Sequence, residues 1–188
     1  MHPSDLPEPR EIHSILQELE VGGWPEHSDE SPGEDSRFDT FSKLLQPLGC
    51  VQQNKRSHPE GDVLYHSLQV FELLCDSFPY DEETLLAGLL HDVGRGIDPL
   101  NHVDAALNAL SGLISERTAW LIENHMDSRG LVDGSIGSRA RRRLVAHEDF
   151  EELEALVRAD LDGRQPGMRV RELEVALAYI RGLDTAFE

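Results

Sequence analysis

The sequence has no long apolar run and very few cysteines. No stretch of about 18 consecutive apolar residues occurs, so we expect no transmembrane helix and no membrane partner. The segment Met1 to Arg10 is polar and rich in proline, without the basic and then apolar regions of a secretory signal. The two cysteines, Cys50 and Cys75, are too few for a disulfide framework. These absences favour a reduced, cytoplasmic protein.

Positive charge is also scarce. The 36 Asp and Glu residues outnumber the 17 Lys and Arg residues, which gives a formal net charge of −19. Such a charge repels phosphate backbones, so we do not expect nucleic acid as a general partner. The segment 139–181 is less acidic and contains arginines at 139 and 141–143. We favour a solvated helix surface for these arginines, with contact to a phosphorylated ligand as the alternative.

The chain divides into two parts by composition. Residues 1–35 contain five prolines among Ser, Gly, Asp and Glu, so we expect an acidic, disordered or loosely attached tail. Residues 36–188 have enough apolar residues for one domain with its own core.

Helical signals dominate this second part. Apolar residues recur at helical spacing between Val63 and Cys75, with Asp62 as a possible cap. Asp81 is a suitable N-cap for a helix over residues 82–92, which Gly94 would end. Strand-like alternation is absent, so we predict an all-α bundle of about seven helices. Further helices are expected over residues 39–46, 101–111 (capped by Asn101), 115–126 (capped by Ser115), 139–147, 149–161 and 170–183.

Two adjacent potential metal ligands, His91 and Asp92, follow the apolar run of residues 85–90. An imidazole nitrogen and a carboxylate oxygen together suit a divalent transition ion. A His-Asp dipeptide is common by chance, so by itself it is a weak indication of a metal site. Gly94 would let the backbone turn away and leave room for a substrate.

Four further ionisable residues lie on or near predicted helices: His66, His102, His125 and Asp160. Each has a structural interpretation when taken alone, as a hydrogen-bonded core histidine or as a carboxylate paired with an arginine. Burying several such groups in a small bundle costs several kcal/mol apiece unless they are paired or bound to metal. The whole set therefore favours a metal site.

The order His66, His91-Asp92, Asp160 resembles that of the HD superfamily of metal-dependent phosphohydrolases, over about residues 37–183. Local segments resemble more specifically the HD domain of bacterial tRNA nucleotidyltransferases, the CCA-adding enzymes. These segments are His58-Pro-Glu-Gly-Asp-Val-Leu-Tyr-His66, Leu89-Leu-His-Asp-Val-Gly-Arg95, Glu123-Asn-His-Met126 and Val157-Arg-Ala-Asp160.

The resemblance implies an HD-domain bundle that holds one or two divalent metal ions per chain. The metal would activate water and neutralise charge on a phosphoryl group. Nitrogen and oxygen ligands admit Mn, Ni, Co, Fe, Zn or Mg. The implied ligands are His66, His91, Asp92 and Asp160 for the first ion, and His102 and His125, with Asp92 shared, for a second.

The implied activity is that of a phosphatase or phosphodiesterase on a small phosphorylated compound, in particular a nucleotide, including 2′,3′-cyclic ones. Asp92 would be the catalytic carboxylate, and Arg95 would hold a phosphate oxygen. His102 and His125 would contact the substrate if only one ion binds. Arg95 stands where the family usually has a lysine. Its planar guanidinium group binds phosphate differently from the ammonium group of a lysine.

Three residues before the first ligand have a possible supporting role. His58 and Glu60 could contact His66 on the side away from the metal and so orient its ring. Asp62 could do the same, or it could cap the helix, which is the interpretation we favour.

The nucleotidyltransferase head has no counterpart in this sequence. We find no Gly-Gly phosphate loop followed by an Asp-x-Asp pair on a strand. Asp160-Leu-Asp162 has the spacing of such a pair, but its context is helical and apolar, so we reject it. We therefore expect the hydrolytic module standing alone.

Two other functions compete with a hydrolase. A non-catalytic HD fold could act as a ligand sensor or scaffold, but a scaffold has no physical need for a hydrophilic cluster inside. A tRNA-processing accessory domain is the second alternative, and the missing head and the charge of −19 argue against it.

Overall fold

The computed structural model describes residues 34–184, and this part of the chain contains eight α-helices, two 3-10 helices and no strand. The predicted all-α bundle is confirmed. None of these helices is both long and apolar enough to cross a membrane. The predicted tail lies outside the described residues except for its last two positions, and its boundary stays a prediction. The elements are α2 (Glu34–Leu45), η1 (Gln46–Cys50), α3 (Val63–Ser77), α4 (Glu82–Leu90), η2 (Val93–Gly96), α5 (His102–Ala109), α6 (Glu116–Asp133), α7 (Ser138–Val145), α8 (Phe150–Asp162) and α9 (Leu173–Asp184).

Short polar side chains fix the beginnings of several helices. Asp62, Asp81 and Ser115 each accept a hydrogen bond from the backbone N–H three residues later, which satisfies one free donor of the first turn. The favoured interpretation of Asp62 as a cap is thereby confirmed. Asn101 differs, because its side chain donates to Asp98 at 2.9 Å and makes no capping bond to α5.

Most helix ends differ from those predicted by one or two residues, and the ends of α4 and α6 bear on the structure most. Helix α4 ends at Leu90 instead of residue 92, and His91 forms its C-cap before the 3-10 turn η2 begins. Helix α6 continues past Met126 to Asp133, because its C-cap is Gly134, which adopts the left-handed conformation with φ 77°.

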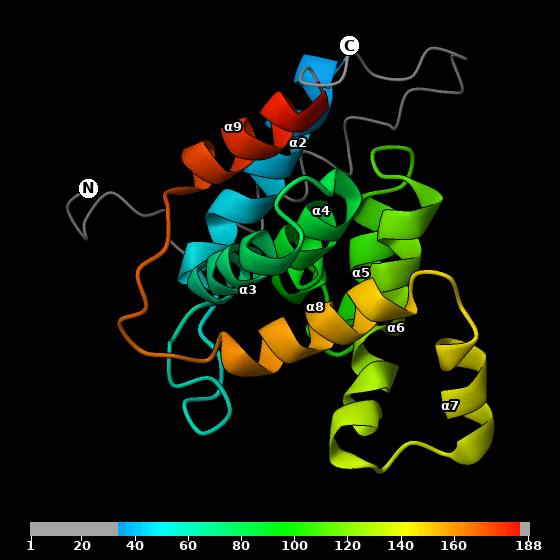
Figure 1. The fold of residues 1–188 in the computed structure, drawn as a ribbon. Coiled ribbons are helices and arrows are strands. Elements are labelled where there is room, and N and C mark those ends of the chain that lie inside the picture. Colours follow the sequence, from blue (N-terminus) through cyan, green and yellow to red (C-terminus); the bar gives the residue numbers. More distant parts are fainter. Residues whose placement is uncertain (1–33, 185–188) are drawn as a thin grey trace.

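Helix α4 lies at the centre of the bundle. Its residues from Thr84 to Leu90 are all buried, as expected for a helix that is apolar on every side. It packs against α3, α6, α8 and α9. In Figure 1, α2 and α9 lie together on one side of this centre, α6 and α8 lie on the other, and α7 projects from the body. Because His91 and Asp92 directly follow α4, the chain places them in the interior.

Arg117 connects the beginnings of α4, α6 and α8. Its guanidinium donates to Asp81 at 2.7 and 2.9 Å, to Glu83 at 3.1 Å and to Asp149 at 2.5 Å. Glu152 lies at 3.0 Å from the same group. Burial raises the pKa of the Asp81 carboxyl, but the hydrogen bonds from Arg117 and Thr84 and the charge of Arg117 together outweigh burial and hold this pKa below its ordinary value.

We expect Arg117→Met to lower the free energy of unfolding by about 2 kcal/mol, because four carboxylates lose a shared partner. Urea denaturation at pH 7 measures this loss. The difference should shrink below pH ~4, because Asp81 loses its paired charge as the pH falls through its depressed pKa. Arg158→Met is the matched control, since it removes one exposed pair with Glu154 and should cost less than about 0.5 kcal/mol. Equal losses in the two variants would contradict the structural role of Arg117.

Candidate metal centre

The structure brings together all six residues that the sequence suggested as metal ligands. They come from separate elements that surround the end of α4. Five of the side chains have no exposed surface, and His102 is 7% exposed. Their places are His66 in α3, His91 as the C-cap of α4, Asp92 as the N-cap of η2, His102 at the start of α5, His125 in α6 and Asp160 in α8.

Their ligand atoms form two overlapping groups. Atoms of His66, His91 and Asp160 all lie within 4.8 Å of one another. The same holds for His91, Asp92 and His125. His91 belongs to both groups, so these five residues form one continuous cluster, and His102 joins it through Asp92 at 3.4 Å.

Asp92 lies between two of the histidines. Its Oδ2 lies 3.6 Å from Nε2 of His91, and its Oδ1 lies 3.4 Å from Nε2 of His102. Burial raises the pKa of this carboxyl, but His91, Arg95 and His125 outweigh burial and keep the pKa below its ordinary value. Asp92 is therefore an anion whose two oxygens face different ligands, as required of a carboxylate that bridges two ions.

Backbone carbonyls orient two of the rings. Nδ1 of His91 donates to the carbonyl of Gly88 at 2.8 Å, and Nδ1 of His125 donates to that of Ile122 at 2.6 Å. Because each carbonyl can only accept, the proton of each neutral ring is on Nδ1. The lone pair is then on Nε2, which faces the cluster, and this is the arrangement found for metal-binding histidines.

Several buried polar atoms in the cluster lack a hydrogen-bond partner within the described part of the chain. Such atoms are costly in a protein interior, where polar groups are nearly always paired. A cation placed among them would satisfy all of them together, so the residues fit a divalent metal ion. The atoms are Nε2 of His91, His102 and His125 and both carboxylate oxygens of Asp92.

The histidines are in the protonation state that metal binding needs. Burial lowers the pKa of His102 and of His125 to about 4, and it also lowers the pKa of His91. These rings are therefore neutral at pH 7, and their Nε2 lone pairs are available to a cation.

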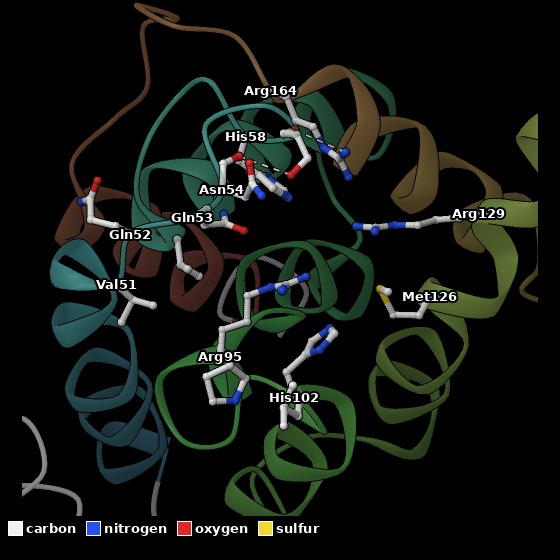
Figure 2. Close-up of a pocket in the computed structure, with 14 residues that line it drawn as sticks. Val51, Gln52, Gln53, Asn54, His58, Arg95, His102, Met126, Arg129 and Arg164 are labelled. Atoms are coloured by element: carbon white, nitrogen blue, oxygen red, sulfur yellow. Dashed lines mark hydrogen bonds between the residues drawn. The ribbon is translucent and has the colours of Figure 1, made fainter.

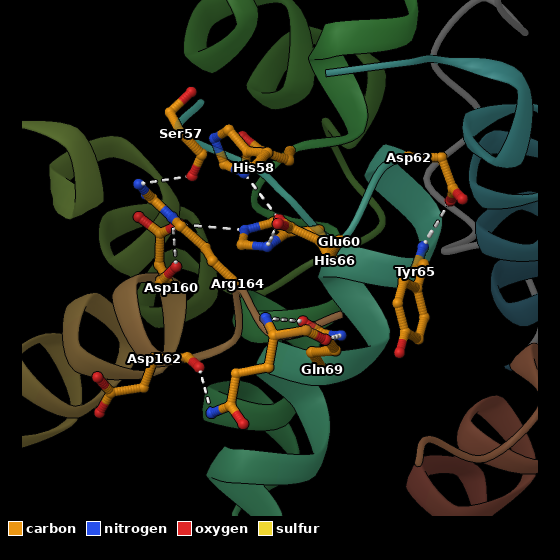
Figure 3. A network of polar contacts seen from close by, with 12 residues as sticks. Ser57, His58, Glu60, Asp62, Tyr65, His66, Gln69, Asp160, Asp162 and Arg164 are labelled. Atoms are coloured by element: carbon orange, nitrogen blue, oxygen red, sulfur yellow. Dashed lines mark hydrogen bonds and ion pairs between the residues drawn. The ribbon is translucent and has the colours of Figure 1, made fainter. Parts of the chain in front are cut away.

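Glu60 supports the cluster from the side of α3. Its side chain has no exposed surface, and its Oε1 lies 2.8 Å from Nδ1 of His58 and 2.9 Å from Nδ1 of His66. Figure 3 shows the carboxylate between the two rings. Nε2 of His66 lies 3.1 Å from Oδ1 of Asp160, where the two atoms form a hydrogen bond when the ring carries its proton on Nε2. In the other tautomer the proton is on Nδ1, toward Glu60, and the Nε2 lone pair is available to a cation.

A cavity of about 560 Å³ opens beside the cluster. Its wall includes Arg95 and His102, whereas the fully buried His125 is not part of it. Figure 2 shows Arg95 reaching into the cavity, with Arg129 on one side and Arg164 on another. This volume is in the range of small-molecule sites.

Sequence reasoning missed Arg129 and Arg164. The arginines it considered, at 139 and 141–143, are exposed on α7 and line no part of this cavity. A signal was present, because Arg129 follows His125 by four residues and Arg164 follows Asp160 by four. At that spacing, two side chains on a helix share a face.

Comparison with known families agrees with this geometry. A family model described as the HD domain matches residues 63–166, which is more than half of the chain. No curated protein gives a significant match. The HD domain is typically a metal-dependent hydrolase domain, and the matched segment contains all six clustered residues. The chain belongs to the HD domain family.

Proposed function

We propose that this protein is a metal-dependent phosphohydrolase, a phosphatase or phosphodiesterase that acts on a small phosphorylated compound, in particular a nucleotide. The observation that carries the proposal is the group of buried, unpartnered nitrogen and oxygen atoms at the end of α4. Membership in the HD domain family supports the same reaction class. The cavity beside the cluster would admit the substrate.

The first ion would be held by His66, His91, Asp92 and Asp160. His102 and His125 would hold a second ion, with Asp92 shared, because its two oxygens face His91 and His102. The ligands suit Mn, Ni, Co, Fe, Zn or Mg. The metal supplies activation of water and neutralises charge on the phosphoryl group.

The surrounding side chains would bind and orient the substrate. Arg95 lies at the cavity wall and would donate to a phosphate oxygen. Gln53 lines another part of the wall, and its buried Nε2 has no partner within the described residues. An acceptor on a nucleobase or sugar would satisfy this donor. The resemblance to the HD domain of CCA-adding enzymes also favours a nucleotide.

A non-catalytic sensor or scaffold is the main rival. A scaffold gains nothing from burying Asp92 beside three neutral imidazoles whose Nε2 atoms have no hydrogen-bond partner in the described residues, since apolar residues would stabilise the fold better. A tRNA-processing role is less favoured, because the net charge of −19 opposes docking of a long RNA.

A screen of phosphatase and phosphodiesterase substrates with each of the six metals tests the proposal. Nucleoside monophosphates and 2′,3′-cyclic AMP should be turned over in the presence of at least one metal. Labelled ATP and tRNA should give no labelled RNA product. Failure to hydrolyse any substrate with any metal would favour the sensor or scaffold.

The number of ions is a separate prediction. We expect the metal-free protein to bind two ions per chain in a calorimetric titration, because the cluster extends from His66 to His102. His102→Ala should bind one ion fewer. Saturation of the wild type at one ion, with no change in His102→Ala, would make His102 and His125 substrate contacts instead of ligands.

A further inference from the structure

The cavity wall has a charge opposite to that of the whole chain. Among the described residues, three arginines and no Asp or Glu line the cavity, although the chain has 36 acids and only 17 Lys and Arg. The arginines are Arg95 in η2, Arg129 in α6 and Arg164 just after α8. A partly enclosed wall of one sign concentrates the electric field and attracts ions of the opposite sign.

Each of these arginines also contacts a carboxylate of the metal cluster. Nε of Arg95 lies 2.6 Å from Oδ2 of Asp92. Arg129 donates to Oδ2 of Asp160 at 2.9 and 2.5 Å, and Arg164 donates to Oδ1 of the same carboxylate at 3.2 Å. The three guanidinium groups are therefore fixed next to the atoms that would hold the metal, where a reacting phosphoryl group would lie.

Nitrogen donors remain available on two of these groups, Arg95 and Arg129. Arg164 already donates through Nε to the carbonyl of Asp160 at 3.0 Å, through Nη1 to that of Ser57 at 3.5 Å and through Nη2 to the Asp160 carboxylate. Arg95 uses only Nε toward Asp92, and the described residues offer its two terminal nitrogens no hydrogen-bond partner. Nη1 of Arg129 is likewise not engaged by any described residue, since its bonds to Asp160 use Nε and Nη2. An arginine that donates some of its N–H groups to a carboxylate can donate the remaining N–H groups to a phosphate oxygen.

We propose that Arg95, Arg129 and Arg164 select a terminal phosphate dianion, so that the enzyme prefers phosphomonoesters to phosphodiesters, including 2′,3′-cyclic nucleotides. This inference rests on the proposed function and narrows its substrate class. A monoester has three non-bridging oxygens and two negative charges near neutral pH. A diester has two such oxygens and one charge, and its second ester group takes the place of an acceptor. Arg95, Arg129 and a cation would offer one partner to each of the three oxygens of the monoester, and Arg164 adds positive charge to the same wall.

The direct test compares kcat/KM for p-nitrophenyl phosphate with that for bis(p-nitrophenyl) phosphate. The wild type should favour the monoester by at least about tenfold, the equivalent of one charge-assisted hydrogen bond. Arg129→Gln and Arg164→Gln should each lower this ratio severalfold. A ratio cancels any general loss that follows from loosening Asp160, and metal content is measured for every variant. Arg158→Gln, on the exposed side of α8, should leave the ratio unchanged.

A binding experiment separates this inference from the proposed function. Inorganic phosphate and dimethyl phosphate are titrated into the metal-loaded protein by calorimetry. Phosphate should bind at least about tenfold more tightly, and Arg129→Gln and Arg164→Gln should remove most of the difference. This result would support the dianion site even if no hydrolysis were found. Preference for the diester, or equal preference in wild type and both variants, would overturn the inference while leaving a phosphodiesterase possible.

Discussion

Asp92→Ala is expected to fold like the wild type but to lose its bound metal and to lower turnover by at least about 10³-fold. The reason is that Asp92 is the one carboxylate whose two oxygens face two different histidines of the cluster. Elemental analysis of the purified protein and turnover with added metal measure the two effects. Circular dichroism checks the fold, which should persist because the charge left without its partner is Arg95, whose side chain is 19% exposed and can be solvated.

Asp104→Ala is the matched control for this variant. Asp104 is an exposed aspartate on α5, two residues after His102, and its replacement by alanine is the same chemical change made outside the cluster. Metal content and turnover should equal those of the wild type. If Asp92→Ala retained its metal, the assignment of Asp92 as a shared ligand would be wrong.

Gly94→Ala is expected to lower the free energy of unfolding by about 3 kcal/mol or more. A Cβ at Gly94 would lie 1.8 Å from the carbonyl oxygen of His102 and 2.8 Å from the backbone nitrogen of Ala106. Both neighbours are backbone atoms, so α5 must shift as a unit. Because this shift moves His102 away from Asp92, metal affinity should fall as well.

Chemical denaturation of the metal-free protein measures the stability loss, and a metal titration measures the second effect. Gly182→Ala is the control, because a Cβ there meets no atom of the described residues within 4 Å outside the backbone of its own helix. Its position in α9 predicts an unchanged or slightly higher stability. A wild-type stability for Gly94→Ala would show that η2 and α5 are not packed as closely as the structure has them.

The helices were predictable because their signals are local. Apolar spacing and the caps Asp62, Asp81 and Ser115 give every described helix an expected place, and the all-α bundle followed. The two 3-10 turns were missed, since a short 3-10 segment has no distinctive spacing. The close approach of η2 to α5 explains why a glycine is needed at position 94, because an added Cβ would meet the backbone of His102. The predicted role as a helix stop explains this glycine less well, since such a Cβ would not meet the end of α4.

The site was predictable only in part. The six candidate ligands have unusual side chains for apolar helices, so the sequence alone singled them out. Glu60 was expected to orient His66, and it lies between His58 and His66. Other supports depend on how helices pack: Arg129 in α6 donates to Asp160 in α8, 31 residues away. No local pattern specifies such contacts. Arg129 and Arg164 each follow a candidate ligand by four residues. This spacing indicates a functional role only once the structure shows that both arginines line the cavity.

The most direct test of the central claim is the hydrolysis of 3′-AMP by chelator-treated protein before and after each divalent metal is restored. We predict no turnover without metal, restored turnover with at least one of the six metals, and no restoration in Asp92→Ala. Equal turnover with and without metal, or turnover by Asp92→Ala at the wild-type rate, would contradict a metal-dependent reaction at this cluster.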